Sequence, residues 1–155
     1  AIHAGKAPNI IPDYVEMCGT LRSLDFDSRV KMQDAIDRIV KSCCEAMRGH
    51  GEVTWEKGMP PLVNSDEVID GLAAAAAETI GSDHISTVKN PSLGSEDFSY
   101  LFPEFAPGAQ FRLGSGNDED PNTRHGIHNS RNTFDDSCIE TGAAVIVQYT
   151  RNFLK

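Results

Sequence analysis

The sequence predicts a mixed α/β protein, because segments with the period of a strand and segments with the period of a helix follow one another along it. Residues 13–22 place successive side chains on two alternating faces, which is typical of a β-strand. Apolar residues of the 28–48 segment recur every three to four positions, which indicates an amphipathic helix. A Gly-Met-Pro-Pro break at 58–61 then separates this first part from a second one.

The first part has the order strand, helix, strand. Asp27 or Ser28 can cap the start of the 28–48 helix, because short polar side chains accept hydrogen bonds from the first free backbone amides. A second strand is expected at 52–56, where alternate residues share one face. We therefore place a domain boundary after this strand, near residues 57–63.

The second part opens with a helix capped at Asn64 or Ser65, which runs to Ile80 and stops at Gly81. The elements expected after it are, in order, a strand at 84–88, a short helix within 92–108, a strand at 109–113, a polar loop at 114–131 and a closing helix at 135–154. A loop of that length inside a compact domain is usually functional or disordered.

Composition excludes several classes of function. The 155 residues include 14 lysines and arginines and 23 aspartates and glutamates, which gives a net charge of −9. This excess of acid argues against binding of nucleic acid, which needs clustered basic residues. No apolar run approaches the ~20 residues that cross a bilayer, so we expect no membrane partner. The four cysteines show no CxxC pair and no disulfide framework, so we expect reduced, mostly buried thiols and a cytoplasmic location.

The first of three unusual clusters combines Asn9 with Arg22. An arginine at the end of a strand offers a rigid fork suited to a carboxylate, and a nearby asparagine amide can supply another donor. The alternative is a surface arginine beyond a strand and a turn asparagine before Pro12. From these residues alone, that structural alternative is favoured.

The second cluster is the run Gly-Ser-Glu-Asp-Phe at 94–98. The adjacent carboxylates of Glu96 and Asp97 can orient a metal ligand or accept from a neighbouring donor. They can equally form an ordinary helix cap that complements the helix dipole. The residues alone again favour the second interpretation.

The third cluster is Arg-His-Gly-Ile-His-Asn at 124–129, at the end of the polar loop. His125 and His128 lie three positions apart, and a loop histidine before a closing helix is a plausible metal ligand. One or two histidines do not complete a metal site, because zinc takes four ligands, or three and a water. A histidine that binds nothing is the alternative.

Taken together, the segments resemble the zinc-dependent amidohydrolases of the aminoacylase/carboxypeptidase superfamily. The branch they resemble holds hippurate hydrolase, the indole-acetyl-amino-acid hydrolases and N-acetyl-diaminopimelate deacetylase. The resemblance covers essentially all 155 residues. The segments that carry it are GKAPNIIPDYVEMCGTLR, PPLVN, GSEDFSY, PGAQFRLG and HNSRNTFDD followed by TGAAV.

The resemblance implies two domains and a longer parent protein. Residues 1–58 match the second half of a lid domain of the ferredoxin-like βαββαβ kind, which usually forms the homodimer. Residues 59–155 match the C-terminal part of a metallo-aminopeptidase-like catalytic domain. The general base, the lid histidine and most metal ligands would lie upstream, so no catalytic residue is expected within this chain.

For the metal site, the resemblance implies that His128 is the family's C-terminal ligand and that His125 is not. Glu96 and Asp97 match a motif beside the metal site and are given a supporting role. The parent enzyme would hold two divalent ions, zinc or else manganese, cobalt or nickel. We expect this chain alone to bind none of them tightly.

For the substrate, the resemblance implies that Asn9 and Arg22 hold a free carboxylate, typically across the dimer, and that Gly114 lines the pocket. The parent would cleave the amide bond of N-acyl amino acids, peptides or related small conjugates with a metal-activated water. The chain itself is expected to be inactive. The alternatives are a non-catalytic dimerisation or carboxylate-binding module and a plain acidic structural domain.

Overall fold

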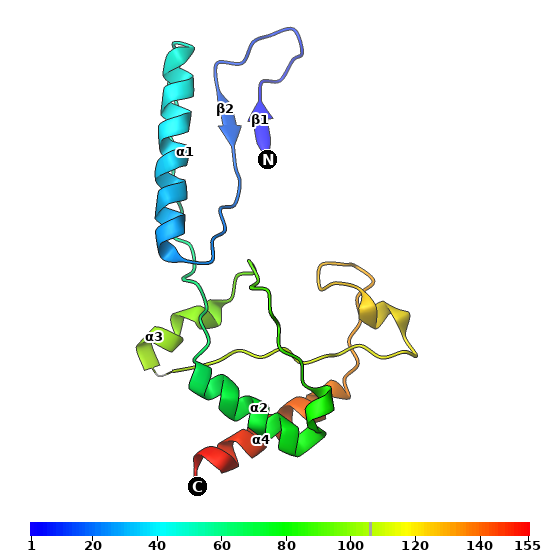
Figure 1. Cartoon of the computed structure of the whole chain (residues 1–155). Coiled ribbons are helices and arrows are strands. Elements are labelled where there is room, and N and C mark those ends of the chain that lie inside the picture. Colours follow the sequence, from blue (N-terminus) through cyan, green and yellow to red (C-terminus); the bar gives the residue numbers. More distant parts are fainter. Residues whose placement is uncertain (106) are drawn as a thin grey trace. The chain divides into compact units, whose positions relative to one another are not determined.

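The computed structural model describes residues 1–105 and 107–155, and it describes residues 103 and 105 by their backbone alone. The described chain divides into two compact units. Unit 1 comprises Ala1–Pro61 with Pro91–Ser95, and unit 2 comprises Leu62–Asn90 with Glu96–Lys155. Helices together with a two-stranded antiparallel sheet confirm the mixed α/β class (Figure 1).

Unit 1 begins with a short hairpin. Strands β1 (Ile2–Ala4) and β2 (Val15–Met17) pair antiparallel, with Ile2 opposite Met17. The strand predicted at 13–22 is therefore formed over its middle only, because β1 offers just three residues for pairing. The sequence analysis missed β1, since three residues are too few for an alternating pattern to register.

Helix α1 (Phe26–Ala46) follows the hairpin and confirms the helix predicted at 28–48. Its cap is Asp25, whose carboxylate accepts a hydrogen bond from the Ser28 amide at 2.7 Å. The prediction of Asp27 or Ser28 as the cap was wrong, because the extended backbone at Asp25 already brings its side chain to the free amide. That hydrogen bond lowers the pKa of Asp25 below its usual value.

The segment after α1 runs back along that helix. A Cβ on Gly51 would lie 2.6 Å from the Cys44 sulfur, and the Trp55 indole donates to Asp37 at 3.0 Å. Alternate residues from 51 to 55 are half-buried, as in a strand with one covered face. The strand predicted at 52–56 is nevertheless not formed, because no neighbouring strand among the described residues pairs with its backbone.

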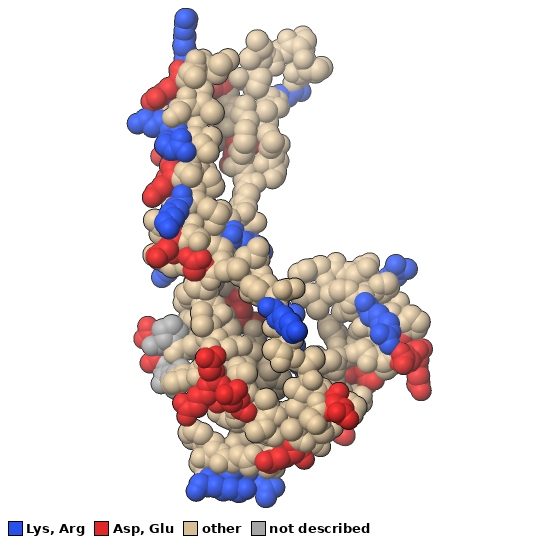
Figure 2. Space-filling model, viewed as in Figure 1, with Lys and Arg blue, Asp and Glu red and all other residues tan. Residues whose placement is uncertain are grey.

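The face of α1 seen in Figure 2 carries both signs of charge along its length. Its half-buried residues instead recur at helical spacing on one side, as at Met32, Ile36, Val40 and Cys44. The amphipathic pattern of the sequence thus corresponds to one side turned toward the 51–58 segment and one toward solvent. The charged residues of the helix are Asp27, Arg29, Lys31, Asp34, Asp37, Arg38, Lys41 and Glu45.

Unit 2 is built on helices α2 (Asp66–Ile80) and α4 (Cys138–Phe153), which pack against each other. Both confirm predicted helices, and α2 has Ser65 and Gly81 at its two ends as expected. Ala75 on α2 and Val145 on α4 are the buried apolar residues of the described chain, and the contact between the two helices forms the seam of this unit. Gly142 on α4 is also buried, and a Cβ on it would lie 2.8 Å from the Leu113 side chain, so α4 packs against Leu113 as well.

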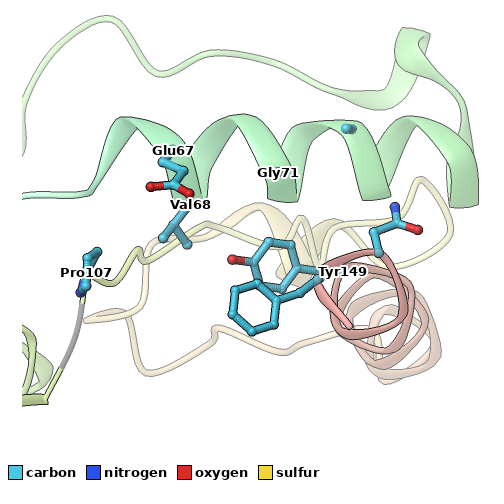
Figure 3. A pocket seen from close by; sticks show the side chains of 8 residues that line it. Glu67, Val68, Gly71, Pro107 and Tyr149 are labelled. Carbon is cyan, nitrogen blue, oxygen red and sulfur yellow. The ribbon is translucent and has the colours of Figure 1, made fainter. Parts of the chain in front are cut away.

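A pocket of about 490 Å³ opens beside this seam (Figure 3). The Tyr149 ring stands over α2 near Gly71, and a Cβ at Gly71 would meet that ring at 2.8 Å. The close approach of the two helices at this point therefore depends on a residue without a side chain. The pocket is lined by Glu67, Val68, Gly71, Ala74, Pro107, Tyr149, Asn152 and Phe153.

A polar contact also joins helices α2 and α4. Glu78 on α2 accepts hydrogen bonds from Gln148 at 2.6 Å and from Asn152 at 3.1 Å, both on α4. These bonds, led by the one from Asn152, lower the pKa of Glu78 below its usual value. The ionised carboxylate is therefore the form that the folded state favours.

Acid is expected to destabilise unit 2 through this contact. A folded-state pKa below the unfolded value gives stability that is present at neutral pH and is lost as the pH falls through the folded-state pKa. The midpoint of thermal unfolding should fall below about pH 4, in part through this contact. Circular dichroism melts between about pH 7 and pH 3 measure it, and Glu78→Gln should make the midpoint less sensitive to pH. An equally steep fall in that variant would contradict the assignment.

Four short elements complete unit 2, namely η1 (Ser82–His84), η2 (Asp97–Tyr100), α3 (Phe102–Phe105) and η3 (Pro121–Arg124). They include the short helix predicted within 92–108, of which position 106 lies outside the described residues. The strands predicted at 84–88 and 109–113 are not formed. Among the residues that the structure describes, neither segment has a neighbouring strand to pair with.

Much of the described chain lies at the surface. All four cysteines are free, and Cys18 and Cys43 are exposed, so the expectation of mostly buried thiols was wrong. They lie on a short hairpin and on a helix with no fully buried residue. No helix in the described residues is long and apolar enough to cross a membrane. The total accessible surface is 12968 Å².

Candidate functional site

The polar segment between residues 115 and 137, called here the 115–137 loop, is closed at its base by Asp135 (yellow to orange in Figure 1). The Asp135 amide donates to the Ser115 carbonyl at 3.0 Å. Its carboxylate accepts from the Asn117 side chain at 2.8 Å and from the Ser137 amide at 2.9 Å. One aspartate thus joins the two ends of the loop and the approach to α4.

A second aspartate joins the loop further from its base. The Asp120 carboxylate accepts from the Thr133 hydroxyl at 2.7 Å and from the Asn122 amide at 2.9 Å. The Thr123 hydroxyl fills the interior, because it donates to the Asp120 carbonyl at 2.7 Å and accepts from the Asn117 amide at 3.1 Å. The acidic and amide side chains of this loop therefore form hydrogen bonds within the loop, both to its backbone and to side chains further along it.

Both carboxylates are held in their charged form. The Thr133 hydroxyl, followed by the Asn122 amide, lowers the pKa of Asp120. The Asn117 side chain, followed by Ser137, lowers the pKa of Asp135. Hydrogen bonds to an ionised carboxylate are shorter and stronger than neutral ones, so both closures are strongest near neutral pH.

His128 lies within the part of the loop that these contacts enclose. It is exposed, whereas His125 is half-buried and its amide donates to the Asn122 carbonyl at 3.1 Å. Tight turns hold the backbone around His128, since Asn129 donates to the Gly126 carbonyl and its side chain accepts from the Arg131 amide. The loop thus presents one histidine to its surroundings on a backbone with many internal bonds.

Gly114 is the residue directly before this loop. It is exposed, and a Cβ placed on it would meet nothing within 4 Å. Packing within the described chain therefore does not require glycine there. Open space beside the base of the loop is compatible with the predicted pocket-lining role.

Glu96 is tied to the segment that leads to Gly114. Its carboxylate accepts from the Gln110 side chain at 2.7 Å and from the Phe98 amide at 3.3 Å, and these bonds lower its pKa, the Gln110 bond most. The Asn64 side chain accepts from the Gln110 amide at 2.8 Å and donates to the Gln110 carbonyl at 3.1 Å. The Asn64 side chain thus forms the two backbone hydrogen bonds at Gln110 that a neighbouring strand would form in a sheet.

The two candidate residues of unit 1 lie in segments that leave opposite ends of the hairpin. Asn9 is an exposed residue of the turn between β1 and β2, and Arg22 lies on the path from β2 to α1 (Figure 1). The Arg22 guanidinium donates through Nη1 to the Leu93 carbonyl at 2.7 Å and to the Ser95 hydroxyl at 3.0 Å. Its remaining donors have no hydrogen bond within the described part of the chain.

Asp97 is the exposed first residue of η2, beside Glu96. In unit 2 the structure therefore connects Glu96, through Gln110, to the segment of Gly114 and the loop of His128. Asn9 and Arg22 belong to unit 1.

His128 is a candidate ligand for a divalent metal, and the histidine, cysteine, aspartate and glutamate side chains near it show whether a metal site could form. No group of three or more histidine, cysteine, aspartate or glutamate side chains that could hold a metal occurs within residues 1–105 and 107–155. The described residues thus fit the role of one ligand and not a complete site.

The sequence analysis missed Asn64, Gln110, Asn117, Asp120 and Asp135 as residues that organise this region. The signal was present in the unusually polar loop and in the repeated asparagine and aspartate residues, which favour turns that bind their own backbone. The pairing of Asp120 with Thr133 joins positions thirteen residues apart, which no local pattern specifies.

Comparison with known proteins decides the family. The model of peptidase family M20/M25/M40 matches residues 5–152. The chain belongs to this family. The match supports the resemblance inferred from the five segments, and it spans both units.

Three relatives of this M20/M25/M40 chain illustrate the range of names in the family. A "Probable hydrolase" of Synechocystis sp. is 37% identical over 145 residues, which are 94% of this chain and 36% of the relative. "Thermostable carboxypeptidase 1" of Saccharolobus solfataricus is 40% identical over 92% of this chain and 35% of the relative. The N-acetyldiaminopimelate deacetylase of Bacillus subtilis is 27% identical over 96% of this chain and 37% of the relative.

The chain thus spans little more than a third of the length of these relatives. No solved structure gives a significant match.

Proposed function

We propose that the protein containing this chain is a metal-dependent amidohydrolase that cleaves the amide bond of N-acyl amino acids or related small conjugates. The observation that carries the proposal is the family match over residues 5–152, in which relatives bear the names hydrolase, carboxypeptidase and deacetylase. Carboxypeptidase and deacetylase names share one chemistry, which is hydrolysis of an amide bond next to an amino acid.

In this proposal His128 supplies one ligand to the divalent metal, zinc or else manganese, cobalt or nickel. Its exposure and its place on an internally bonded loop support that role. A bound divalent ion would acidify a water molecule for attack on the amide carbonyl. The other ligands and the general base lie outside the 155 residues, so this chain alone should not turn over substrate.

Asn9 and Arg22 bind the free carboxylate of the substrate. The donors of Arg22 that remain beyond Nη1 support this role, because a guanidinium binds a carboxylate through two parallel bonds. We propose that Asn9 and Arg22 together hold this carboxylate across the interface of a homodimer. Glu96 and Asp97 support the site, and Gly114 lines the substrate pocket.

Hydrolysis of an N-acetyl amino acid by the protein at its native length tests the proposal. Activity should appear with added zinc or manganese and disappear with a chelator, and the same substrate with its carboxylate converted to an amide should react poorly. The 155-residue chain should be inactive in parallel. Binding of the acyl amino acid without turnover by the protein at native length would instead favour a carboxylate-binding module.

Replacement of Arg22 by alanine should raise KM for the free-carboxylate substrate about tenfold or more, because a charge-assisted hydrogen bond contributes ~1.5–3 kcal/mol. Metal content should not change. Steady-state kinetics and elemental analysis measure the two quantities.

Two variants serve as controls for Arg22. Arg38→Ala removes an exposed charge on α1 and should leave KM unchanged. Ser95→Ala removes one hydrogen bond of Arg22 while keeping its guanidinium, so a rise in KM equal to that of Arg22→Ala would show that the arginine only holds the 91–95 segment. Unchanged kinetics in Arg22→Ala itself would refute the clamp.

A further inference from the structure

The 115–137 loop is rich in acidic residues. Two of them lie on either side of the segment that holds His128. Asp120 reaches forward to Thr133, and Asp135 reaches back to Ser115 and Asn117. Each joins chain on one side of His128 to chain on the other side, so the two form successive closures of a single loop.

The bond from Thr133 to Asp120 leaves twelve positions between its ends, 121–132, and His128 is among them. Without the two carboxylates that backbone would be tied across His128 only by two backbone bonds, from the Thr133 amide to the Asn122 carbonyl at 3.5 Å and from the Asp135 amide to the Ser115 carbonyl at 3.0 Å. Ordering a free backbone costs conformational entropy, so a ligand on an open loop would lose part of its affinity for a metal. In a closed loop the backbone is already ordered before His128 binds the metal.

We infer that Asp135 and Asp120 are positioning residues, which close the 115–137 loop and so fix His128 in the geometry that binds metal. This inference rests on the proposed function, because it needs His128 to be a ligand. In this inference neither aspartate is a ligand of the metal or a contact of the substrate. Their contribution passes through the backbone of the loop.

The hydrogen-bond pattern at Asp135 allows a sharp test. Asp135 is acceptor only, whereas Asn117 donates to it and at the same time accepts from the amides of Glu119 and Asp120. In Asp135→Asn the side chain has a single acceptor oxygen for two donors, Asn117 and Ser137, so one contact is lost.

Exchanging the two residues should restore the bond in reverse. In the double variant Asp135→Asn with Asn117→Asp, the new asparagine donates to the new aspartate. Its oxygen still accepts from Ser137, and the new aspartate still accepts from the amides of Glu119 and Asp120. Every contact of the wild-type closure is therefore available again.

The first measurement is hydrogen–deuterium exchange of residues 121–133 in the metal-free protein at native length. Asp135→Asn should speed this exchange about tenfold, and the exchanged pair should return it close to the wild-type rate. The second measurement is the dissociation constant for Co²⁺ by absorption spectroscopy, which should rise about tenfold in Asp135→Asn and recover in the pair. Asp136→Asn is the matched control, because its side chain has no hydrogen bond among the described residues.

The outcomes separate this inference from the proposed function. Normal exchange in Asp135→Asn, or no recovery in the exchanged pair, would overturn the closure. Faster exchange with an unchanged Co²⁺ constant would overturn the positioning role. If His128→Ala also binds Co²⁺ normally, the ligand assignment fails with it, whereas a weakened His128→Ala beside a normal Asp135→Asn leaves the proposed function intact.

Discussion

Replacement of His128 by alanine is expected to lower the affinity for divalent metal and the rate of amide hydrolysis by about 100-fold or more, because loss of a direct ligand should exceed the 10–100-fold effect of losing a ligand's hydrogen-bond partner. The side chain is exposed and lies on a loop held by its own hydrogen bonds, so its removal should not unfold the chain. Elemental analysis after dialysis and steady-state kinetics at native length measure the two effects.

His125→Ala is the matched control for this prediction. His125 lies three positions earlier, on the same loop, and its backbone amide bonds to Asn122, which alanine preserves. The control should retain metal and turnover. Equal losses in both variants would mean that the loop as a whole was disturbed, and normal metal content in His128→Ala would show that the ligand assignment is wrong.

Replacement of Gly71 by valine is expected to lower the free energy of unfolding by about 2 kcal/mol, because added carbon atoms in a close-packed contact cost ~1–3 kcal/mol. A Cβ there would lie 2.8 Å from the Tyr149 ring, well inside van der Waals contact. Valine is no worse than glycine in a helix by intrinsic propensity, so the loss would come from the ring. Urea denaturation followed by circular dichroism measures it.

Two comparisons decide whether the Tyr149 ring is the cause. Gly19→Val introduces the same side chain where a Cβ meets nothing within 4 Å, and it should change stability by less than about 0.5 kcal/mol. Removing the ring with Tyr149→Ala should relieve most of the cost of Gly71→Val in the double variant. Additive losses from Gly71→Val and Tyr149→Ala would place the strain elsewhere.

Helices were the part of the fold that the sequence predicted well. The long helices α1, α2 and α4 follow the apolar periodicity of their sequences, which is a pattern between residues only a few positions apart. The strands expected at 52–56, 84–88 and 109–113 did not form, and the first of them was predicted from alternation, which reports a covered and an uncovered face. Alternation does not provide a neighbouring strand, and a β-ladder needs one.

The candidate site divides in the same way. The sequence singled out His128, Glu96 and Arg22 because their residue types have recognisable chemistry at those spacings. It could not reveal the closures of the loop, because the bond between Asp120 and Thr133 depends on the path of the backbone between them. The pairing of Asn64 with Gln110 spans 46 positions, and it is a contact of tertiary structure alone.

The accessible surface of the chain has a consequence for its unfolding. A single folded chain of 16.9 kDa is expected to expose ~7,700 Å² and its unfolded form ~24,500 Å². Because this chain exposes 12968 Å² when folded, unfolding uncovers only about two-thirds of the usual increment. The urea m-value and the heat-capacity change both scale with that increment, so the chain should unfold over a broad range of denaturant with a flat stability curve.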